Sequence, residues 1–300
     1  MKIQFLSALC LTLAAPLALA QAPQSKPSAF PARTLNVAVL IYPGMNTLDA
    51  TGPLEVFDLA NDIAPKAFNV YTLAQSAAPV APHGSAFSMT PLYSFANAPR
   101  PDIVVVPGAS LQTLAQLGKN RTLLDWVRSQ SKAPQLMSVC TGSFLLGSAG
   151  VLDGRRATTH WFMTTDFHSQ FPRVTLRQNV RFVEDGNVLT TAGVSSGIDG
   201  ALRVVEKARG TNVADTVARV MQYRPHTPAF PLVSVTAKPI QNAVLQPGQK
   251  LALDFDPVCH MKLSADDKAT FAYKGQVYGF CSSGCRDRFA AHPEQFLKTK

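Results

Sequence analysis

Four short apolar runs alternate with longer mixed segments over the first half of the chain. The runs are rich in Val, Ile and Leu, a composition that favours strands buried on both faces of a sheet. The predicted strands are residues 35–41, 68–73, 102–106 and 135–139. The predicted helices between and after them are residues 53–61, 111–117, 121–131 and 141–149. Strands that alternate with helices predict an α/β fold with a parallel sheet covered on both faces.

The alternation continues to residue 223 and then stops. The segments predicted there are helices at 162–171, 197–207 and 213–223 and a hairpin of 180–183 with 188–191. Residues 224–254 contain five prolines and little helical periodicity, so we expect a linker. The chain therefore predicts an α/β domain at 34–223 and a small α+β module at 255–300.

The N-terminus has the features of an export signal. Lys2 precedes an apolar stretch at 3–15, and Ala18-Leu19-Ala20 forms a small-x-small cleavage site. The apolar stretch is too short for a good membrane span. We therefore expect residues 1–20 to be a cleaved signal peptide, residues 21–33 a Pro- and Ala-rich tether, and the mature protein to be periplasmic and free of the membrane.

The composition bears on nucleic acid as a partner and on the pairing of the cysteines. The formal net charge is +9, but the basic residues are spread out with no long run, which disfavours nucleic acid as a partner. Cys10 lies in the predicted signal, which leaves Cys140, Cys259, Cys281 and Cys285 in the mature chain. In an oxidising compartment, a Cys281–Cys285 or a Cys259–Cys285 disulfide stays open at this point.

Cys140 has the sequence context of a nucleophile. The predicted strand at 135–139 runs into Cys140-Thr141-Gly142, and a helix follows at once. Such a turn strains the backbone of the nucleophile and exposes its side chain above the strand ends. We expect the helix N-terminus to lower the pKa of the Cys140 thiol. A buried, inert cysteine is the alternative.

A wider set of motifs resembles the ThiJ/PfpI (class I glutamine-amidotransferase-like) superfamily, and within it the isonitrile hydratase branch. The resemblance covers about residues 34–223 and is carried by residues 44–56, 106–109, 138–142, 157–161 and 191–199. It implies a flavodoxin-like fold, a small-molecule substrate, no cofactor for this domain and the possibility of a homodimer. Regulators of the same branch carry a DNA-binding unit after this domain, but here a different module stands in its place.

The resemblance also implies roles for individual residues. Cys140 matches the family's elbow cysteine, and Asp49 matches the acidic residue that faces it and can hold or deliver a proton. The backbone N–H groups of Thr141 and of Gly108 or Ala109 would form an oxyanion hole.

Roles are also expected for His160 and Asp199 of the α/β domain. His160 matches a histidine near the cysteine, either a base or a hydrogen-bonded structural residue. Asp199 is expected to support the cap of its helix.

The C-terminal module carries three thiols at suggestive spacings. Cys281 and Cys285 are four residues apart and share one face of a predicted helix that Ser282 or Ser283 would cap. A predicted strand pair at 270–273 and 276–280 would bring Cys259 alongside. Three soft ligands suit Cu(I) or Zn. The segment resembles the YHS domain, with the departure that His260 replaces the usual glycine; His260 is either an added ligand or a tolerated substitution.

Two functions follow from these patterns. The first is an exported, cysteine-dependent hydratase or hydrolase-like enzyme that acts on a small electrophile such as an isonitrile or a reactive carbonyl. The second is a periplasmic protein that binds metal or handles redox chemistry without turnover.

Overall fold

The computed structural model describes residues 30–84, 87–223, 242–258, 261–263, 269–291 and 293–297. The predicted signal peptide, most of the tether, Cys259 and His260 lie outside these residues. No helix in the described part is long and apolar enough to cross a membrane.

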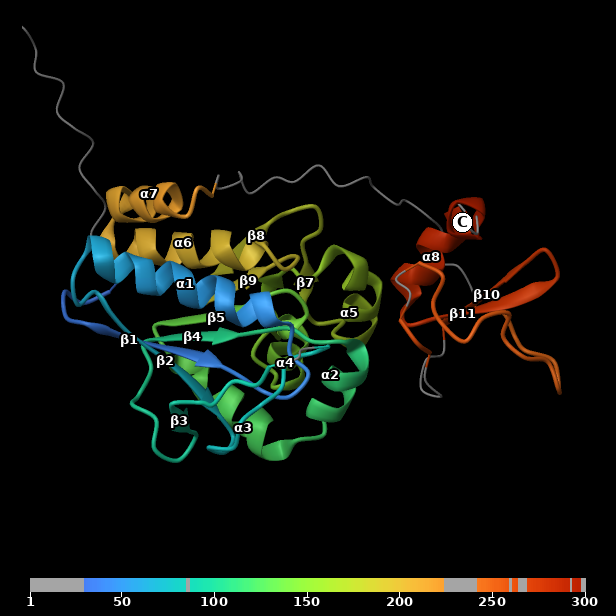
Figure 1. Ribbon diagram of the computed structural model, residues 1–300, viewed down its shortest axis with the longest axis horizontal. Helices are drawn as coiled ribbons and strands as arrows, with labels where there is room; N and C mark the ends of the chain where they lie inside the picture. The colour runs from blue at the N-terminus through green and yellow to red at the C-terminus, as the bar shows by residue number, and fades with distance from the viewer. Residues whose placement is uncertain are drawn as a thin grey trace, which may run out of the picture.

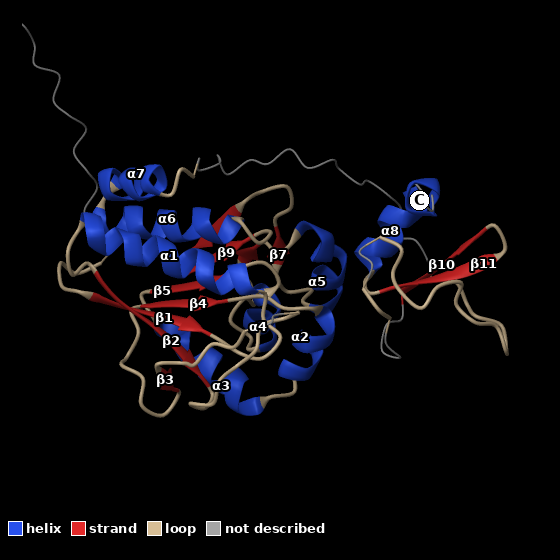
Figure 2. Cartoon of the chain, viewed as in Figure 1, coloured by secondary structure: helices blue, strands red, loops and turns tan. Residues whose placement is uncertain are grey.

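A seven-stranded sheet forms the centre of the α/β domain (Figures 1 and 2). Its order is β3-β2-β1-β4-β5-β9-β8, and every neighbouring pair is parallel except the β8–β9 hairpin. The strands are β1 (Leu35–Leu40), β2 (Phe68–Ala74), β3 (Tyr93–Ser94), β4 (Ile103–Val106), β5 (Gln135–Ser138), β8 (Phe182–Asp185) and β9 (Val188–Thr191). A separate short pair is formed by β6 (Arg156–Ala157) and β7 (Thr175–Leu176). The predicted parallel α/β architecture is confirmed, whereas the two-residue strands were too short to give a sequence pattern.

Helices cover both faces of the sheet (Figure 1). The helices of the domain are α1 (Thr47–Ile63), α2 (Leu111–Leu117), α3 (Arg121–Ser129), α4 (Gly142–Ser148), α5 (Thr164–Gln170), α6 (Ser196–Arg209) and α7 (Thr211–Val220), with 3-10 turns η1 (Gln130–Lys132) and η2 (Trp161–Met163). In Figure 1, α1, α6 and α7 lie above the sheet, and α3 and α4 lie below it.

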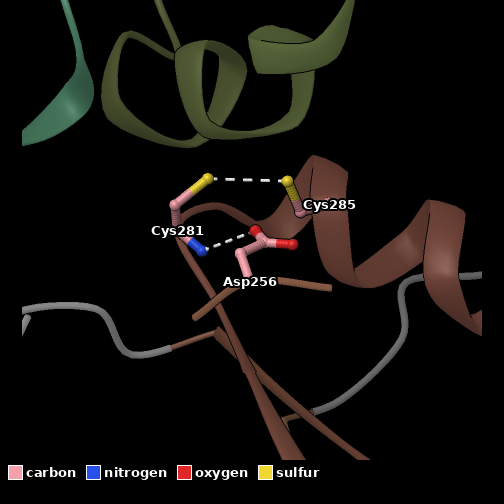
Figure 3. Close-up of side chains that lie close together, drawn as sticks. All are labelled: Asp256, Cys281 and Cys285. Atoms are coloured by element: carbon pink, nitrogen blue, oxygen red, sulfur yellow. Dashed lines mark hydrogen bonds between the residues drawn. The ribbon is translucent and has the colours of Figure 1, made fainter. Parts of the chain in front are cut away.

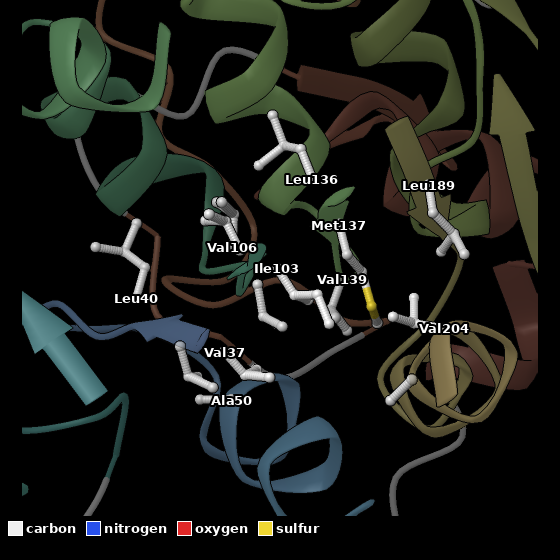
Figure 4. Packing of buried hydrophobic residues seen from close by; sticks show 14 of the residues in the cluster. Val37, Leu40, Ala50, Ile103, Val106, Leu136, Met137, Val139, Leu189 and Val204 are labelled. Carbon is white, nitrogen blue, oxygen red and sulfur yellow. The ribbon is translucent and has the colours of Figure 1, made fainter. Parts of the chain in front are cut away.

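Buried aliphatic side chains from neighbouring strands and from helices join in one core (Figure 4). Val37 of β1, Ile103 of β4 and Met137 of β5 are fully buried, as are Ala50 of α1 and Val204 of α6. The Val- and Ile-rich runs read from the sequence are therefore central strands. These central strands position the strand ends at which the candidate site lies.

Helix α1 begins earlier than its sequence suggested. The sequence predicted a helix at residues 53–61. In the structure the helix begins at Thr47, and Pro53 lies inside it. Proline has no N–H, so the bond that would reach back to the carbonyl of Asp49 is missing. The earlier start places Asp49 in the first turn of α1.

Asp199 has a different structural role from the one expected. Helix α6 begins at Ser196, and no side chain caps it. Asp199 instead forms a buried ion pair with Arg181, whose Nε donates to Asp199 Oδ2 at 2.5 Å. Arg181 also donates to the hydroxyls of Ser195 and Tyr223. The pair joins α6 to the residue before β8.

Replacing Asp199 by alanine is expected to lower the free energy of unfolding by about 3–5 kcal/mol, because Arg181 would keep a buried charge without its carboxylate. Urea titration followed by circular dichroism measures this. Asp153→Ala is the matched control, since its pair with Arg173 is exposed and should change stability by less than about 1 kcal/mol. Equal losses in the two variants would contradict the structural role of Asp199.

The end of the predicted tether packs on the α/β domain. Phe30 is buried in the core, and the Arg33 guanidinium donates to both carboxylate oxygens of Asp102, at 2.8 and 2.6 Å. Residues 30–33 therefore belong to the domain, and the tether is shorter than predicted.

The C-terminal module has its own small core. Its elements are β10 (Ala269–Tyr273), β11 (Gln276–Phe280), α8 (Ser283–Ala291) and α9 (Pro293–Leu297). The predicted strand pair is present, and its two strands are antiparallel. Its buried cluster consists of Tyr278, Phe280, Cys285 and Phe289. Residues 242–254, predicted as linker, contact the module: the Ala252 N–H donates to the Val277 carbonyl at 2.8 Å.

Candidate functional site

Cys140 lies on a strained turn between β5 and α4. Its φ is +57°, in the left-handed region that non-glycine residues rarely adopt, and its side chain is buried. Gly142 permits this turn, because a Cβ there would overlap the Val106 carbonyl oxygen of β4. The predicted strand-turn-helix geometry is confirmed, but the expectation that the turn exposes the Cys140 side chain is wrong, because that side chain is buried.

Asp49 approaches the elbow from α1. It is fully buried, and its Oδ2 accepts from the Gly108 N–H at 3.0 Å and from the Asn46 amide at 3.3 Å. Its other oxygen, Oδ1, has no hydrogen-bond partner among the described residues. Burial raises the pKa of this carboxyl to about 6. Asp49 can therefore exchange a proton near neutral pH.

The Cys140 thiol has a raised pKa, so the predicted lowering by the helix start is wrong. Burial is the largest cause, and the neighbouring Asp49 carboxylate adds to it. The Thr141 N–H at the helix start acts in the opposite direction but does not outweigh them. The resting Cys140 is therefore a protonated thiol, and the neighbouring Asp49 carboxyl can accept its proton when it is ionised.

The expected oxyanion hole is only half available. Thr141 Oγ1 donates to the Ala109 carbonyl at 2.7 Å and accepts from the Ala109 N–H at 3.0 Å. The Gly108 N–H is bound to Asp49. The N–H groups of Gly108 and Ala109 are therefore engaged within the site, and the Thr141 N–H remains as a donor to the Cys140 sulfur. Gly108 itself is sterically required, because a Cβ there would lie 2.8 Å from Asp49 Oδ2.

His160 is held as a neutral, structural side chain. Its Nδ1 accepts from the Phe162 N–H at 3.4 Å at the start of η2. Burial lowers the pKa of His160 to about 4, so the imidazole is a weak base at neutral pH. Of the two roles left open by the sequence, this geometry favours the structural one.

Two residues of the site were missed in the sequence. Tyr42 is buried, donates to the Pro107 carbonyl at 2.5 Å, and has a pKa raised by burial and by the nearby Asp49 and Cys140. Asn46 supplies the amide that holds Asp49. Asn46 stands three residues before Asp49, a helix-start spacing that could have identified it.

The C-terminal module brings Asp256, Cys281 and Cys285 together (Figure 3). The two sulfurs are 3.5 Å apart and are not joined by a disulfide. The Asp256 Oδ2 accepts from the Cys281 N–H at 2.9 Å, and the Ser282 hydroxyl accepts from the Cys285 N–H at 3.3 Å, as the predicted cap requires. One ligand atom from each of Asp256, Cys281 and Cys285 lies within 4.8 Å of the others. Two thiols and a carboxylate at this spacing fit a soft or borderline cation.

A parallel α/β sheet with a cysteine elbow and a facing buried carboxyl defines the class of the large domain. The chain belongs to the DJ-1/PfpI family, whose model matches residues 35–207. Residues 255–300 match the YHS domain.

Relatives support the same family. Isonitrile hydratase from Pseudomonas putida is 33% identical over 196 residues, covering 65% of this chain and 81% of that protein. The crystal structure of a ThiJ/PfpI family protein from Pseudomonas syringae superposes with a TM-score of 0.57 at 30% identity, over 69% of this chain and 85% of that one. Drosophila melanogaster DJ-1beta has a TM-score of 0.55 at 20% identity over 64% of this chain and 99% of that one, and shares the fold.

Proposed function

We propose that the α/β domain is a hydratase that adds water to an isonitrile, with Cys140 as the nucleophile and Asp49 as the proton shuttle. The observation that carries the proposal is the buried Asp49 carboxyl, whose Oδ1 has no partner in the described structure and whose pKa of about 6 suits proton exchange. The similarity to isonitrile hydratase supports the choice of substrate.

The first step uses the protonated resting thiol. The thiol proton passes through Asp49 to the isonitrile carbon while the Cys140 sulfur bonds to that carbon, giving a thioimidate. Asp49 then takes a proton from a water whose oxygen attacks the same carbon, and returns it to the substrate nitrogen. The carbon–sulfur bond breaks, the hydroxyl proton returns to sulfur, and the product is an N-substituted formamide.

The engaged backbone donors favour this chemistry over acyl transfer. Attack on a peptide or carbonyl group develops negative charge on oxygen and needs preorganised donors. Here the N–H groups of Gly108 and Ala109 are bound to Asp49 and Thr141. Addition to an isonitrile places the incoming proton on carbon, so it needs the acid more than a full oxyanion hole.

The direct test is turnover. The purified protein is incubated with a small alkyl isonitrile, and formamide is followed by NMR, in isotopically labelled water to show that the formyl oxygen comes from solvent. A reactive carbonyl is tested in parallel. Labelled formamide supports the proposal, whereas carbonyl turnover alone would replace it.

The pH dependence provides an independent check. Asp49 must be ionised to take the thiol proton, and its pKa is about 6. We expect kcat/KM to be level above this pKa and to fall about tenfold per pH unit below it. A rate that stays constant down to about pH 4 would rule out this role for the carboxylate.

We further propose that the YHS module binds a soft metal ion such as Cu(I) or Zn. Cys281 and Cys285 would hold it, with Cys259 as a third ligand on the basis of sequence spacing. Binding converts the thiols to thiolates and stabilises the module. Elemental analysis with thiol counting tests this. If metal binds but no electrophile is turned over, the second reading, a binding protein without catalysis, replaces the first.

Export to the periplasm is also a proposal and rests on the predicted signal at residues 1–20. We expect the mature protein to begin at Gln21 and to appear in the periplasmic fraction. N-terminal sequencing of the fractionated protein measures both, and an uncleaved cytoplasmic product would contradict it.

A further inference from the structure

The YHS module contacts the α/β domain through helix α8. Helix α8 lies against η2 and α5, and Figure 1 shows α8 on the side of the module that faces α5. The Phe162 ring packs against the buried cluster of the module, and the Arg288 guanidinium lies 5.6 Å from the centre of the Trp161 ring. In Figure 3 the two sulfurs lie on the side of the module that faces the ribbon of the α/β domain.

One tight contact of this interface lies between the two cysteines. Gly284 is in the first turn of α8, between Cys281 and Cys285, and its backbone sits on the Phe162 carbonyl. A Cβ at Gly284 would overlap that carbonyl oxygen. The position of this turn of α8 is thus tied to both sulfurs and to Phe162.

The other end of the same segment reaches the elbow. The Phe162 N–H donates to His160 Nδ1, and the Thr159 hydroxyl donates to the Cys140 carbonyl at 3.4 Å. Within four consecutive residues, Thr159 therefore contacts the backbone carbonyl of Cys140, and Trp161 and Phe162 contact the thiol-bearing helix α8. We call this segment the 159–162 turn.

We propose that the 159–162 turn is the docking surface for the YHS module, and that metal binding at Cys281 and Cys285 tightens this contact and restricts access to Cys140. A buried thiol reacts with a reagent only when the surrounding segment opens. Metal binding holds Cys281 and Cys285 together and orders the turn of α8 that sits on Phe162. The docked helix then makes opening of the 159–162 turn rarer.

This inference rests on the proposed metal binding but not on isonitrile turnover. The test compares the alkylation rate of Cys140 in the full chain, with and without Zn²⁺, by mass spectrometry of the Cys140 peptide. Zn²⁺ affinity is measured separately by competition with a chromogenic chelator. We expect Zn²⁺ to slow alkylation of Cys140 by about fivefold or more, the lower end of common coupling energies.

Three variants assign the effect. Gly284→Ala should bind Zn²⁺ with similar affinity but lose the protection of Cys140, and alanine is a better helix former than glycine, so α8 is retained. Cys281→Ser should lose both Zn²⁺ binding and the protection of Cys140. That result would exclude direct binding of Zn²⁺ at Cys140 as the cause of the protection. Lys274→Ala, on the exposed turn of the β10–β11 hairpin, should behave as the parent protein.

The outcomes separate the two proposals. Zn²⁺ binding with an unchanged Cys140 rate, or equal protection in Gly284→Ala, overturns the docking inference and leaves metal binding intact. If no Zn²⁺ binds, the metal-binding proposal is wrong. Amide hydrogen exchange of residues 159–167 then tests whether the YHS module docks on the 159–162 turn. Equal exchange in the parent protein and Gly284→Ala would overturn the docking inference.

Discussion

Replacing Cys140 by serine is expected to lower kcat/KM for an isonitrile by at least about 10³-fold. The change keeps the size of the side chain and the strained backbone at φ +57°, so the fold should be retained. A hydroxyl is a far weaker nucleophile than sulfur, and the adjacent acid, with a pKa of about 6, is too weak a base to ionise it. Steady-state kinetics with thermal unfolding as a fold check measure this.

Cys285→Ser is the matched control for this prediction. It makes the same atomic change at another buried cysteine, in the other domain. In the metal-free protein it should leave kcat/KM close to that of the parent. Retained turnover in Cys140→Ser would contradict the assignment of Cys140 as the nucleophile. Equal losses of activity in both variants would indicate a general effect on folding.

Replacing Asp49 by asparagine is expected to lower kcat by about 10²–10⁴-fold while making the protein more stable above pH 6. Asparagine keeps an acceptor for the Gly108 N–H but cannot shuttle a proton. The folded-state pKa of Asp49, about 6, is above its ordinary value of 3.8, so the ionised carboxylate costs stability in the fold. Removing it should raise the free energy of unfolding by up to about 3 kcal/mol.

The pH dependence of that gain follows from the sign of the shift. Below pH 4, Asp49 is protonated in both folded and unfolded chains, and the variant should gain nothing. The gain grows as pH rises towards 6 and then stays level. Denaturant titrations across this range measure it, with Asp199→Asn as the control that should destabilise. A variant that is inactive and also less stable at pH 8 would show that Asp49 is a structural residue.

Much of the site could be anticipated from residue patterns. The strand run into Cys140 and the following Gly142 predicted the elbow, and the structure confirms it with a positive φ. The protonation state of that cysteine was predicted in the wrong direction, because local pattern showed the helix start but not the depth of burial or the nearby carboxylate. Tyr42 was missed for a similar reason, since its link to the site is a contact with the Pro107 carbonyl 65 residues away.

Sequence alone determined the class of each domain, because the hydrophobic periodicity, the turn residues and the cysteine spacing are local patterns that can be read directly along the chain. It predicted the parallel sheet, the elbow and a serine cap for α8, and the structure assigns that cap to Ser282. Tertiary structure decided what those elements do to one another: which N–H groups are engaged, the pKa of Asp49 and Cys140, and the contact between Gly284 and Phe162. Burial and charge proximity depend on distances between segments remote in sequence, and only the folded chain sets those distances.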